Sequence, residues 1–444
     1  MKKEERFYIY LLLFHASIGV LVFILPFLSK LYTLSILAFG IYYIIKTQNR
    51  NNEALILSAY VISVEVLLRM TDGALLNEFG KYLILLFMFV GMIYSGFSKK
   101  AFVYWLFLLL LIPGIILATL TFDLNTDVRK AITFNLSGPV CLGFSAIYCY
   151  QRKISFDRLL DVITAFSMPL ISILVYLFLY TPSVRDVVTG TTSNFETSGG
   201  FGPNQVSTIL GLGIFVFFVQ MVFNSKGKLL QAINAGLVMF FAFRGIVTFS
   251  RGGIMTAIAM IFILLIIMYF QANGKTRPKI GIIILLSLLA GLGVWSYSSI
   301  QTNGLINKRY ANQDARGREK KSKLSGREDL IASELQMFLD NPILGVGVGR
   351  NKEIREKETG IVSASHNEIT RMLAEHGSLG LLDLLILFFT PLVLFMLDRR
   401  NILALSFLAF WLLTINHAAM RLAAPAFVYA LSLLKVDVGR SEVG

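Results

Sequence analysis

Arg251, Arg327 and His366 are the residues of this sequence best suited to act on an anionic substrate. Arg251 lies in the stretch FSRGG between two apolar runs, where we expect a tight glycine turn at the edge of the bilayer. Arg327 and His366 lie in a long polar stretch ahead of another apolar run. Guanidinium binds phosphate through two parallel hydrogen bonds, and a neutral imidazole can accept a proton. These residue types predict that the arginines bind phosphate and that His366 can accept a proton.

Two helix starts are predicted close to Arg327 and His366. The stretches 325–328 and 365–368 each begin with serine and end with glutamate, the spacing of a capping box. Both functional residues would then lie in a first helical turn, where free N–H groups and partial positive charge favour a phosphate. The same positive charge disfavours imidazolium, so we expect His366 to be neutral.

Four further residues are candidate substrate-binding groups: Arg244, Asn204, Asn367 and Glu375. Arg244 precedes Arg251 on an apolar run, where a charged side chain is costly and requires a reason. Asn204 ends a polar, glycine-rich stretch, and the other two accompany the histidine of the second capping box.

Each candidate also has a plainer explanation. An arginine at the end of a membrane helix often snorkels to the bilayer surface, which would account for Arg251. The basic run 308–327 could be a solvated loop that contacts anionic head groups, and a lone histidine in a polar loop usually has no special role. The capped helix start favours the functional interpretation for His366, whereas His376 and His417 lack that setting.

The elements that must position these residues are membrane helices. Of the 444 residues, 55% are hydrophobic and 15% are charged, whereas about 25% are charged in soluble domains. The apolar runs are long enough to cross about 30 Å of hydrocarbon as helices. We therefore predict an all-α polytopic membrane protein with about 12–14 transmembrane helices. Their predicted centres lie near residues 18, 38, 62, 89, 110, 140, 171, 214, 238, 262, 290, 387, 409 and 426, and the last two runs are short.

The distribution of positive charge predicts the orientation in the membrane. Short basic loops alternate with loops poor in Lys and Arg, and together with the termini they hold nearly half of the 41 Lys and Arg. Basic loops of this kind face the cytoplasm, so we expect both termini there. The first apolar run is too long for a signal-peptide core and is expected to remain as a span. The stretch 181–204 and the long loop 300–377 are expected outside the cytoplasm.

The chain divides accordingly into four ranges: N-terminal transmembrane helices (1–180), central transmembrane helices with the SRGG turn (181–299), an extracytoplasmic catalytic loop (300–377) and C-terminal transmembrane helices (378–444). Within the loop, apolar residues at helical spacing predict a short amphipathic helix that ends before Asn341 and Pro342 and could lie on the membrane surface. The ILGVGVG stretch that follows is expected to be a flexible apolar turn.

Composition and motifs exclude several classes of protein. The net charge of +14 is spread over loops between spans, so we expect no nucleic-acid partner. A P-loop, an H-E-x-x-H motif, a Cys/His zinc spacing and a G-x-S-x-G motif are all missing from the sequence. Cys141 and Cys149 would lie about 12 Å apart on one helix, too far for a disulfide. We expect chemistry that uses no metal and no cofactor and is driven by an activated substrate.

Three stretches together resemble the O-antigen ligase and O-antigen polymerase superfamily of bacterial inner membranes. They are SRGG at 250–253, GRxxLxxxxLxxFLDNPILGVGVG at 326–349 and SHNEITRMLAEHGSLGLL at 365–382. Their order and spacing are similar to the family pattern over roughly residues 195–400, whereas the first 180 residues match only as a stack of spans. The family often has an aromatic residue after the G-R pair, where this chain has Leu330.

The resemblance implies a glycosyltransferase that takes a glycan from a polyprenyl-diphosphate carrier at the outer face of the inner membrane. Polymerases pass the glycan to another lipid-linked repeat unit, and ligases pass it to a lipid A-core sugar. The family's arginines correspond to Arg251 and Arg327, and its essential histidine corresponds to His366. Direct displacement at the anomeric carbon would invert its configuration.

The alternative is a lipid-glycan flippase or another multi-span transporter. Transporters use ionisable groups inside the membrane together with broken helices. Glu65 and His15 could form a relay or be packing compromises, and the sequence shows no chain of such groups. A flippase has no evident use for the long outer loop with its arginine and histidine. The glycosyltransferase is therefore favoured, with polymerase and ligase both open.

Overall fold

The computed structural model describes residues 3–123, 126–320, 322, 327–360, 363 and 365–437, and most of them lie in helices. The elements, in chain order, are α1 (Lys3–Ile24), α2 (Leu28–Thr47), α3 (Glu53–Met70), α4 (Phe79–Ser95), η1 (Lys99–Ala101), α5 (Phe102–Leu110), α6 (Ile112–Thr121), α7 (Val128–Cys149), β1 (Lys153–Ser155), α8 (Phe156–Tyr180), α9 (Val184–Val187), η2 (Glu196–Ser198), α10 (Pro203–Val219), η3 (Gln220–Asn224), α11 (Lys228–Ile246), α12 (Arg251–Gln271), α13 (Arg277–Gln301), α14 (Leu305–Tyr310), α15 (Glu328–Asp340), α16 (Arg350–Thr359), α17 (Glu368–Leu397), α18 (Ala404–Ile415), α19 (Ala424–Leu431) and β2 (Lys435–Asp437).

The prediction of an all-α polytopic membrane protein is confirmed. Among the described residues, ten helices are long and apolar enough to cross a membrane, and α4 and α18 are apolar but shorter. Each predicted span centre falls within a helix. The last of these helices, α19, has 8 residues and rises only about 12 Å. It cannot span the bilayer, so the upper figure of fourteen spans is wrong.

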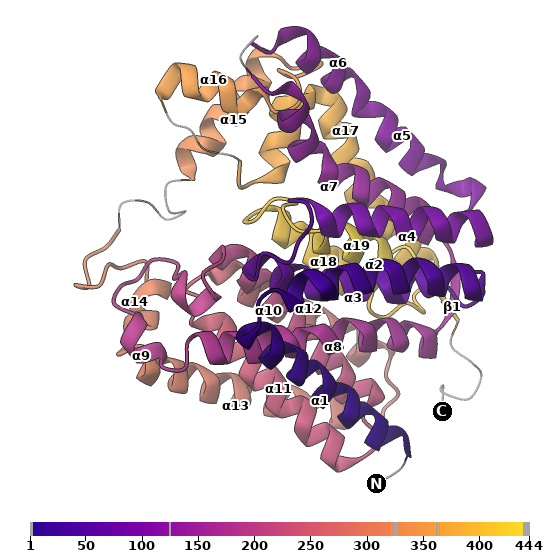
Figure 1. Ribbon diagram of the computed structural model, residues 1–444, viewed down its shortest axis with the longest axis vertical. Coiled ribbons are helices and arrows are strands. Elements are labelled where there is room, and N and C mark those ends of the chain that lie inside the picture. Colours follow the sequence, from indigo (N-terminus) through magenta and orange to yellow (C-terminus); the bar gives the residue numbers. More distant parts are fainter. Residues whose placement is uncertain are drawn as a thin grey trace.

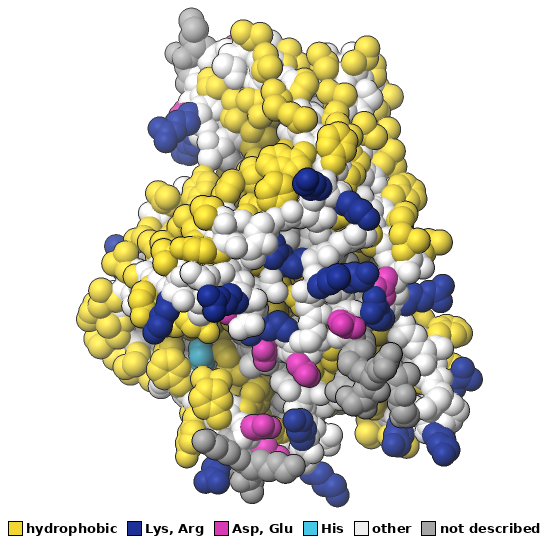
Figure 2. All heavy atoms as spheres, turned by 90° about the vertical axis from the view of Figure 1, so that its right-hand side faces the viewer, with side chains coloured by type: hydrophobic (Ala, Val, Ile, Leu, Met, Phe, Trp, Pro, Cys, Tyr) yellow, Lys and Arg dark blue, Asp and Glu magenta, His cyan; other side chains and the backbone are white. Residues whose placement is uncertain are grey.

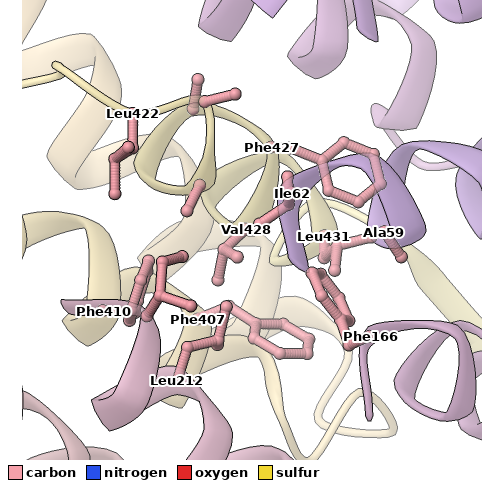
Figure 3. Close-up of a cluster of buried hydrophobic side chains, with 14 of the residues drawn as sticks. Ala59, Ile62, Phe166, Leu212, Phe407, Phe410, Leu422, Phe427, Val428 and Leu431 are labelled. Atoms are coloured by element: carbon pink, nitrogen blue, oxygen red, sulfur yellow. The ribbon is translucent and has the colours of Figure 1, made fainter. Parts of the chain in front are cut away.

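The short helix α19 lies in the centre of the core instead. Every one of its residues is buried, as expected for a helix that is apolar on all sides. Figure 3 shows side chains of α19 among buried hydrophobic side chains of other helices. The side chains drawn there include Ala59 and Ile62 of α3, Phe166 of α8, Leu212 of α10, Phe407 and Phe410 of α18, and Phe427, Val428 and Leu431 of α19.

Polar contacts fix the turn that connects α18 to α19. The Glu65 carboxylate accepts a hydrogen bond from the Ala423 amide at 2.9 Å and forms an ion pair with Arg69 at 2.8 Å. Arg69 in turn donates to the Arg421 carbonyl oxygen at 3.1 Å. Glu65 is therefore a buried structural anchor for this turn. His15 likewise has ordinary partners, since its Nε2 lies 3.0 Å from the Tyr60 hydroxyl oxygen.

The two ends of the molecule differ. The short helices α9, α14, α15 and α16 lie on the left of Figure 1, and the parallel pair of β1 and β2 lies on the right, near the C-terminus. Figure 2 looks at the right-hand end and shows Lys and Arg side chains spread across it. The basic residues of the loops between spans therefore gather at the end opposite to the short helices.

The long polar stretch between α13 and α17 contains three helices, α14, α15 and α16. The predicted amphipathic helix is α15, which ends at Asp340 with Asn341 as its C-cap, as expected. Its buried face carries Leu330 and Met337, while Leu339 is 68% exposed and nearby Ile343 is 70% exposed. These exposed apolar side chains are compatible with a helix that lies on a membrane surface. Helix α16 was not predicted from the sequence.

The ILGVGVG stretch is not the flexible turn that we predicted. Gly345, Gly347 and Gly349 adopt φ angles of 70°, 95° and 80°, and the chain from 345 to 349 is buried. Val346 N–H donates to the Ala374 carbonyl at 2.8 Å, and Gly347 N–H donates to the next carbonyl of α17 at 3.1 Å. Positive φ is accessible to glycine at little cost, so the three glycines allow this ordered segment to pack against α17.

The SRGG stretch is a helix start and not a tight glycine turn. Positive φ occurs at Phe249 (58°), Ser250 is the N-cap of α12, and Arg251 is its first residue. The two glycines lie within α12, at positions where neighbouring residues leave no room for a Cβ. A Cβ on Gly253 would lie 1.9 Å from the carbonyl oxygen of Ser207 in α10.

We predict that Gly253→Ala destabilises the protein, because the backbones of α10 and α12 must separate to admit one methyl group. Overpacking of this kind costs about 1–3 kcal/mol. Thermal unfolding of the purified protein in detergent would measure the change.

Gly281→Ala on α13 is the matched control, because a Cβ there meets no described atom within 4 Å. Alanine is favoured over glycine in a helix by about 1 kcal/mol, so this variant should be unchanged or more stable. Equal stability of the two variants would contradict the close packing of α10 on α12.

Candidate functional site

Arg251 begins α12 beside the N-terminus of α10. Its N-cap residue, Ser250, donates from Oγ to Oδ1 of Asn204 at 2.8 Å. Ser207 of α10 also donates to the Ser250 carbonyl at 2.9 Å. The structure thus places Asn204, a predicted substrate-binding residue, next to the helix start that carries Arg251.

Arg309 of α14 is a neighbour of Arg251 that the sequence analysis did not identify. Its Nε donates to the Phe249 carbonyl at 2.9 Å, which fixes α14 against the turn before α12. Burial and the positive charge of Arg251 lower the pKa of Arg309. The two guanidinium groups therefore lie within electrostatic range of each other.

Arg327 also lies within electrostatic range of Arg251. Burial lowers the pKa of Arg327, and the charge of Arg251 lowers it further. The predicted cap at Ser325 lies outside the described residues. Arg327 itself occupies the N-cap position of α15, so it precedes the first helical turn in which we had expected it. The two arginines are brought together although 76 positions separate them in the sequence (327 − 251).

His366 lies just before α17, and the predicted helix cap is wrong by two residues. The N-cap is Asn367, whose Oδ1 accepts from the amide of Ile369 at 2.9 Å and from that of Thr370 at 3.4 Å. Ser365 does not take that role, because its Oγ accepts from the amide of Asn367 at 3.2 Å and lies 3.2 Å from Oε2 of Glu334. His366 therefore precedes the cap and is not part of the first turn.

His366 is neutral at ordinary pH, but the main cause differs from the one that we predicted. Burial, then the positive charge of Arg421, then that of Arg327 lower its pKa from 6.5 to about 4. Neighbouring cations therefore help to lower the pKa of His366, whereas we had predicted that a helix N-terminus would do so. The imidazole keeps a free lone pair for a proton at physiological pH.

Arg421 and His417 complete the cluster from the turn between α18 and α19. Arg421 donates to the Ser365 carbonyl at 3.0 Å, so it lies against the segment that carries His366. The imidazole of His417 packs on the first turn of α12, where a Cβ on Gly252 would lie 2.3 Å from its Cδ2. His417 lacks a capped helix start, as predicted, but the fold brings it close to the start of α12.

Two other predicted residues, Arg244 and Glu375, lie apart from these contacts. Arg244 is buried and donates to the carbonyls of Leu177, Thr181 and Thr197 at 2.9–3.3 Å, so it ties α8 to η2. Glu375 is buried and forms an ion pair with Arg371. We therefore do not retain Arg244 or Glu375 as substrate ligands.

Asn367 takes part in capping and in a contact across the site. Besides capping α17, its Nδ2 donates to Oδ1 of Asn416 at 3.3 Å. This contact links the start of α17 to the turn that carries His417 and Arg421. His376 lies elsewhere, with its ring buried where a Cβ on Gly114 of α6 would lie 2.5 Å from Nδ1.

We use the term arginine–histidine cluster for six residues: Arg251, Arg309, Arg327, Arg421, His366 and His417. Like charges held close together repel, and a bound anion relieves the repulsion. Four guanidinium groups offer forked donors that match phosphate oxygens. The chemistry of the cluster suits a polyanion next to a neutral base.

Residues 235–385 match the sequence profile of the O-antigen ligase family. The match contains Arg251, Arg309, Arg327 and His366, and it leaves the turn with His417 and Arg421 outside. The predicted resemblance to the O-antigen ligase and polymerase superfamily is confirmed over this segment. No curated protein matches the chain. Together with the ten apolar helices, the match describes a multi-pass membrane protein with an O-antigen ligase segment.

We predict that His366 titrates near pH 4 and that Arg421→Gln moves this midpoint upward, toward the ordinary value of 6.5. Removing a positive neighbour makes protonation of the imidazole easier. Carbethoxylation by diethyl pyrocarbonate, which needs the neutral ring, can be followed at His366 by mass spectrometry across pH.

Arg399→Gln is the matched control, because Arg399 is exposed in the loop 398–401, which follows the C-terminal end of α17. It should leave the midpoint unchanged. A midpoint near 6.5 in the unaltered protein would contradict the placement of His366 among the arginines.

Proposed function

We propose that this protein is a glycosyltransferase that moves a glycan from a polyprenyl-diphosphate carrier to a sugar hydroxyl. The observation that carries the proposal is the arginine–histidine cluster, in which the charges of Arg251 and Arg327 act on one another and that of Arg327 acts on neutral His366. The cluster lies where α12 and α17 begin, so a membrane-embedded lipid can present its head group there. The O-antigen ligase match over the same segment supports this reaction class.

The arginines would stabilise the leaving group. As the bond between the anomeric carbon and the phosphate oxygen breaks, the diphosphate leaves with the electron pair and gains negative charge. Guanidinium groups fixed in advance lower the energy of that state without reorganisation. Arg251 and Arg327 would contact the diphosphate, and Arg309 would add positive charge from behind them. In this proposal the arginines supply the charge that a metal supplies in other transferases.

His366 would act on the acceptor. The acceptor hydroxyl oxygen forms the new bond to the anomeric carbon, and its proton passes to the imidazole. A low pKa makes His366 a weak base, so it accepts the proton late, once the hydroxyl has become acidic through bond formation. Attack opposite to the departing diphosphate inverts the anomeric configuration. The protonated imidazole would then return its proton to solvent.

The two acceptor types of the superfamily both remain compatible with the cluster. A polymerase would pass the glycan to a second lipid-linked repeat unit, and a ligase would pass it to a lipid A-core sugar. Both reactions would take place at the extracytoplasmic face of a bacterial inner membrane. The glycan profile of a deletion strain separates them, because single-repeat products indicate a polymerase and carrier-bound polymer without transfer indicates a ligase.

We predict that His366→Ala lowers the rate of glycan transfer by about 10²–10⁴-fold, and that Arg327→Lys lowers it by about 10²-fold. Lysine keeps the charge but loses the forked donors. The assay uses a purified polyprenyl-diphosphate donor with chelator present.

Arg318→Lys is the matched control, because Arg318 lies in the same long loop but is exposed and paired with Asp314 at 2.7 Å. It should retain full activity. Full activity of His366→Ala would exclude the base, and loss of the wild-type reaction on chelation would exclude a metal-free reaction.

We also predict that the short helices face away from the cytoplasm. A cysteine at Arg318 should react with an impermeant thiol reagent in cells whose outer membrane is permeabilised, and one at Lys275 should not. Both positions are exposed, and the native Cys141 and Cys149 are buried. Labelling at Lys275 alone would reverse the proposed orientation.

A further inference from the structure

Glu334 of α15 is a buried carboxylate that joins three elements around the cluster. It is 1% exposed. Its Oε1 accepts from Nη2 of Arg355 at 2.9 Å and from Nδ2 of Asn351 at 3.2 Å, both on α16. Its Oε2 accepts from Oγ1 of Thr370 at 2.6 Å and from Oγ of Ser365 at 3.2 Å. One oxygen therefore faces α16, and the other faces the start of α17.

Four hydrogen-bond donors surround this carboxylate, which offers about four acceptor positions. The single hydroxyl proton of Ser365 also has the Asn367 carbonyl oxygen as a partner, at 2.9 Å. A charged group away from water is stable only with such partners. Because Arg355 neutralises the charge, the hydroxyl donors on the α17 side are not needed for charge balance alone.

The hydroxyl contacts act on the residue next to His366. Ser365 donates to Glu334 from its side chain and accepts from Arg421 at its carbonyl, at 3.0 Å. Arg355 also donates to the Ser363 carbonyl at 2.7 Å. The chain just before His366 is therefore fixed at both of these residues by groups that reach back to α15, α16 and the α18–α19 turn.

The same helix also carries Arg327. Glu334 lies seven positions after Arg327, or about two helical turns along α15. Any shift of α15 would move the guanidinium and the carboxylate together. The distance between Arg327 and His366 is thus set by α15 and by the Glu334 carboxylate.

We propose that Glu334 is a positioning residue that holds His366 at a fixed place relative to Arg327. This inference rests on the proposed function and deepens it, because it assigns the geometry of the base to a residue that touches no substrate. Productive transfer needs the base and the leaving group in line, and a misplacement of about 1 Å can cost about 10²-fold in rate.

A purely structural role would have a different signature. If Glu334 only stabilised the fold, cutting its contacts would lower the amount of folded protein and affect every variant alike. If it acts through His366, the loss of rate must disappear when His366 is absent, because residues that act through one another are not additive. The test is therefore a double-mutant cycle on the transfer rate.

The variant Ser365→Ala/Thr370→Val removes both donors to Oε2 and leaves the Arg355 ion pair in place. We expect it to lower kcat by about 10²-fold while the KM for the polyprenyl-diphosphate donor changes little. In a His366→Ala background, the same pair of substitutions should change the residual rate by less than about threefold. If the double variant does not accumulate, Thr370→Val alone is taken through the same cycle.

Ser333→Ala is the matched control. It removes a hydroxyl from the same helix, and that hydroxyl makes no hydrogen bond within the described part of the chain. It should retain the full rate.

An equal loss of rate in both backgrounds, or no loss in the unaltered background, would overturn the positioning role. If His366→Ala itself keeps full activity, the proposed function fails. If His366→Ala is inactive but the Ser365/Thr370 variant is unimpaired, only the positioning role fails.

Discussion

The repulsion among the guanidinium groups is the constraint on which the rest of this structure depends. Burial and the charge of Arg251 lower the pKa of Arg309 and of Arg327, and burial and the charge of Arg421 lower the pKa of His366. Without a bound anion, these groups would separate if the chain allowed it. Positive charges at the edge of a membrane therefore need a scaffold that holds them, and much of the fold serves that purpose.

Main-chain carbonyl oxygens accept hydrogen bonds from several arginines in and around the cluster. Arg309 donates to a main-chain carbonyl, and so do Arg69 and Arg421 in the layer around the turn before α19. Close glycine contacts bring α10 and α12 together, and the buried helix α19 fixes the turn with Arg421. The buried carboxylates Glu65 and Glu334 act at the periphery of the cluster. These contacts fix Arg309 and Arg421 at the site proposed for the anionic lipid.

Local signals in the sequence predicted the membrane helices and singled out three residues. Apolar runs indicate the helices, and the motifs with Arg251, Arg327 and His366 carry the resemblance to the O-antigen ligase and polymerase superfamily. The sequence could not reveal Arg309 or Arg421, because an arginine in a basic run or after a short apolar run has no local mark. Only the fold brings these side chains to the site.

The errors also have tertiary causes. Ser365 has the spacing of a helix cap, but its hydroxyl accepts from the Asn367 amide and contacts Glu334, 31 positions earlier, and Asn367 caps α17. The glycines of ILGVGVG predict a flexible turn. Hydrogen bonds to carbonyls of α17 and close contact with the backbone of α6 instead hold this segment in one ordered conformation. Arg244 was weighed as a ligand because a charge in an apolar run is costly, and three main-chain carbonyls compensate that cost.

The central claim is that one diphosphate bridges Arg251 and Arg327 with His366 beside the sugar. An experimental structure of the protein with a non-hydrolysable polyprenyl-diphosphate glycan analogue tests it most directly. The account predicts phosphate oxygens within about 3 Å of both guanidinium groups, and the imidazole of His366 facing the anomeric carbon on the side away from the diphosphate. A diphosphate bound away from both arginines, or a glycan directed away from His366, would contradict the account.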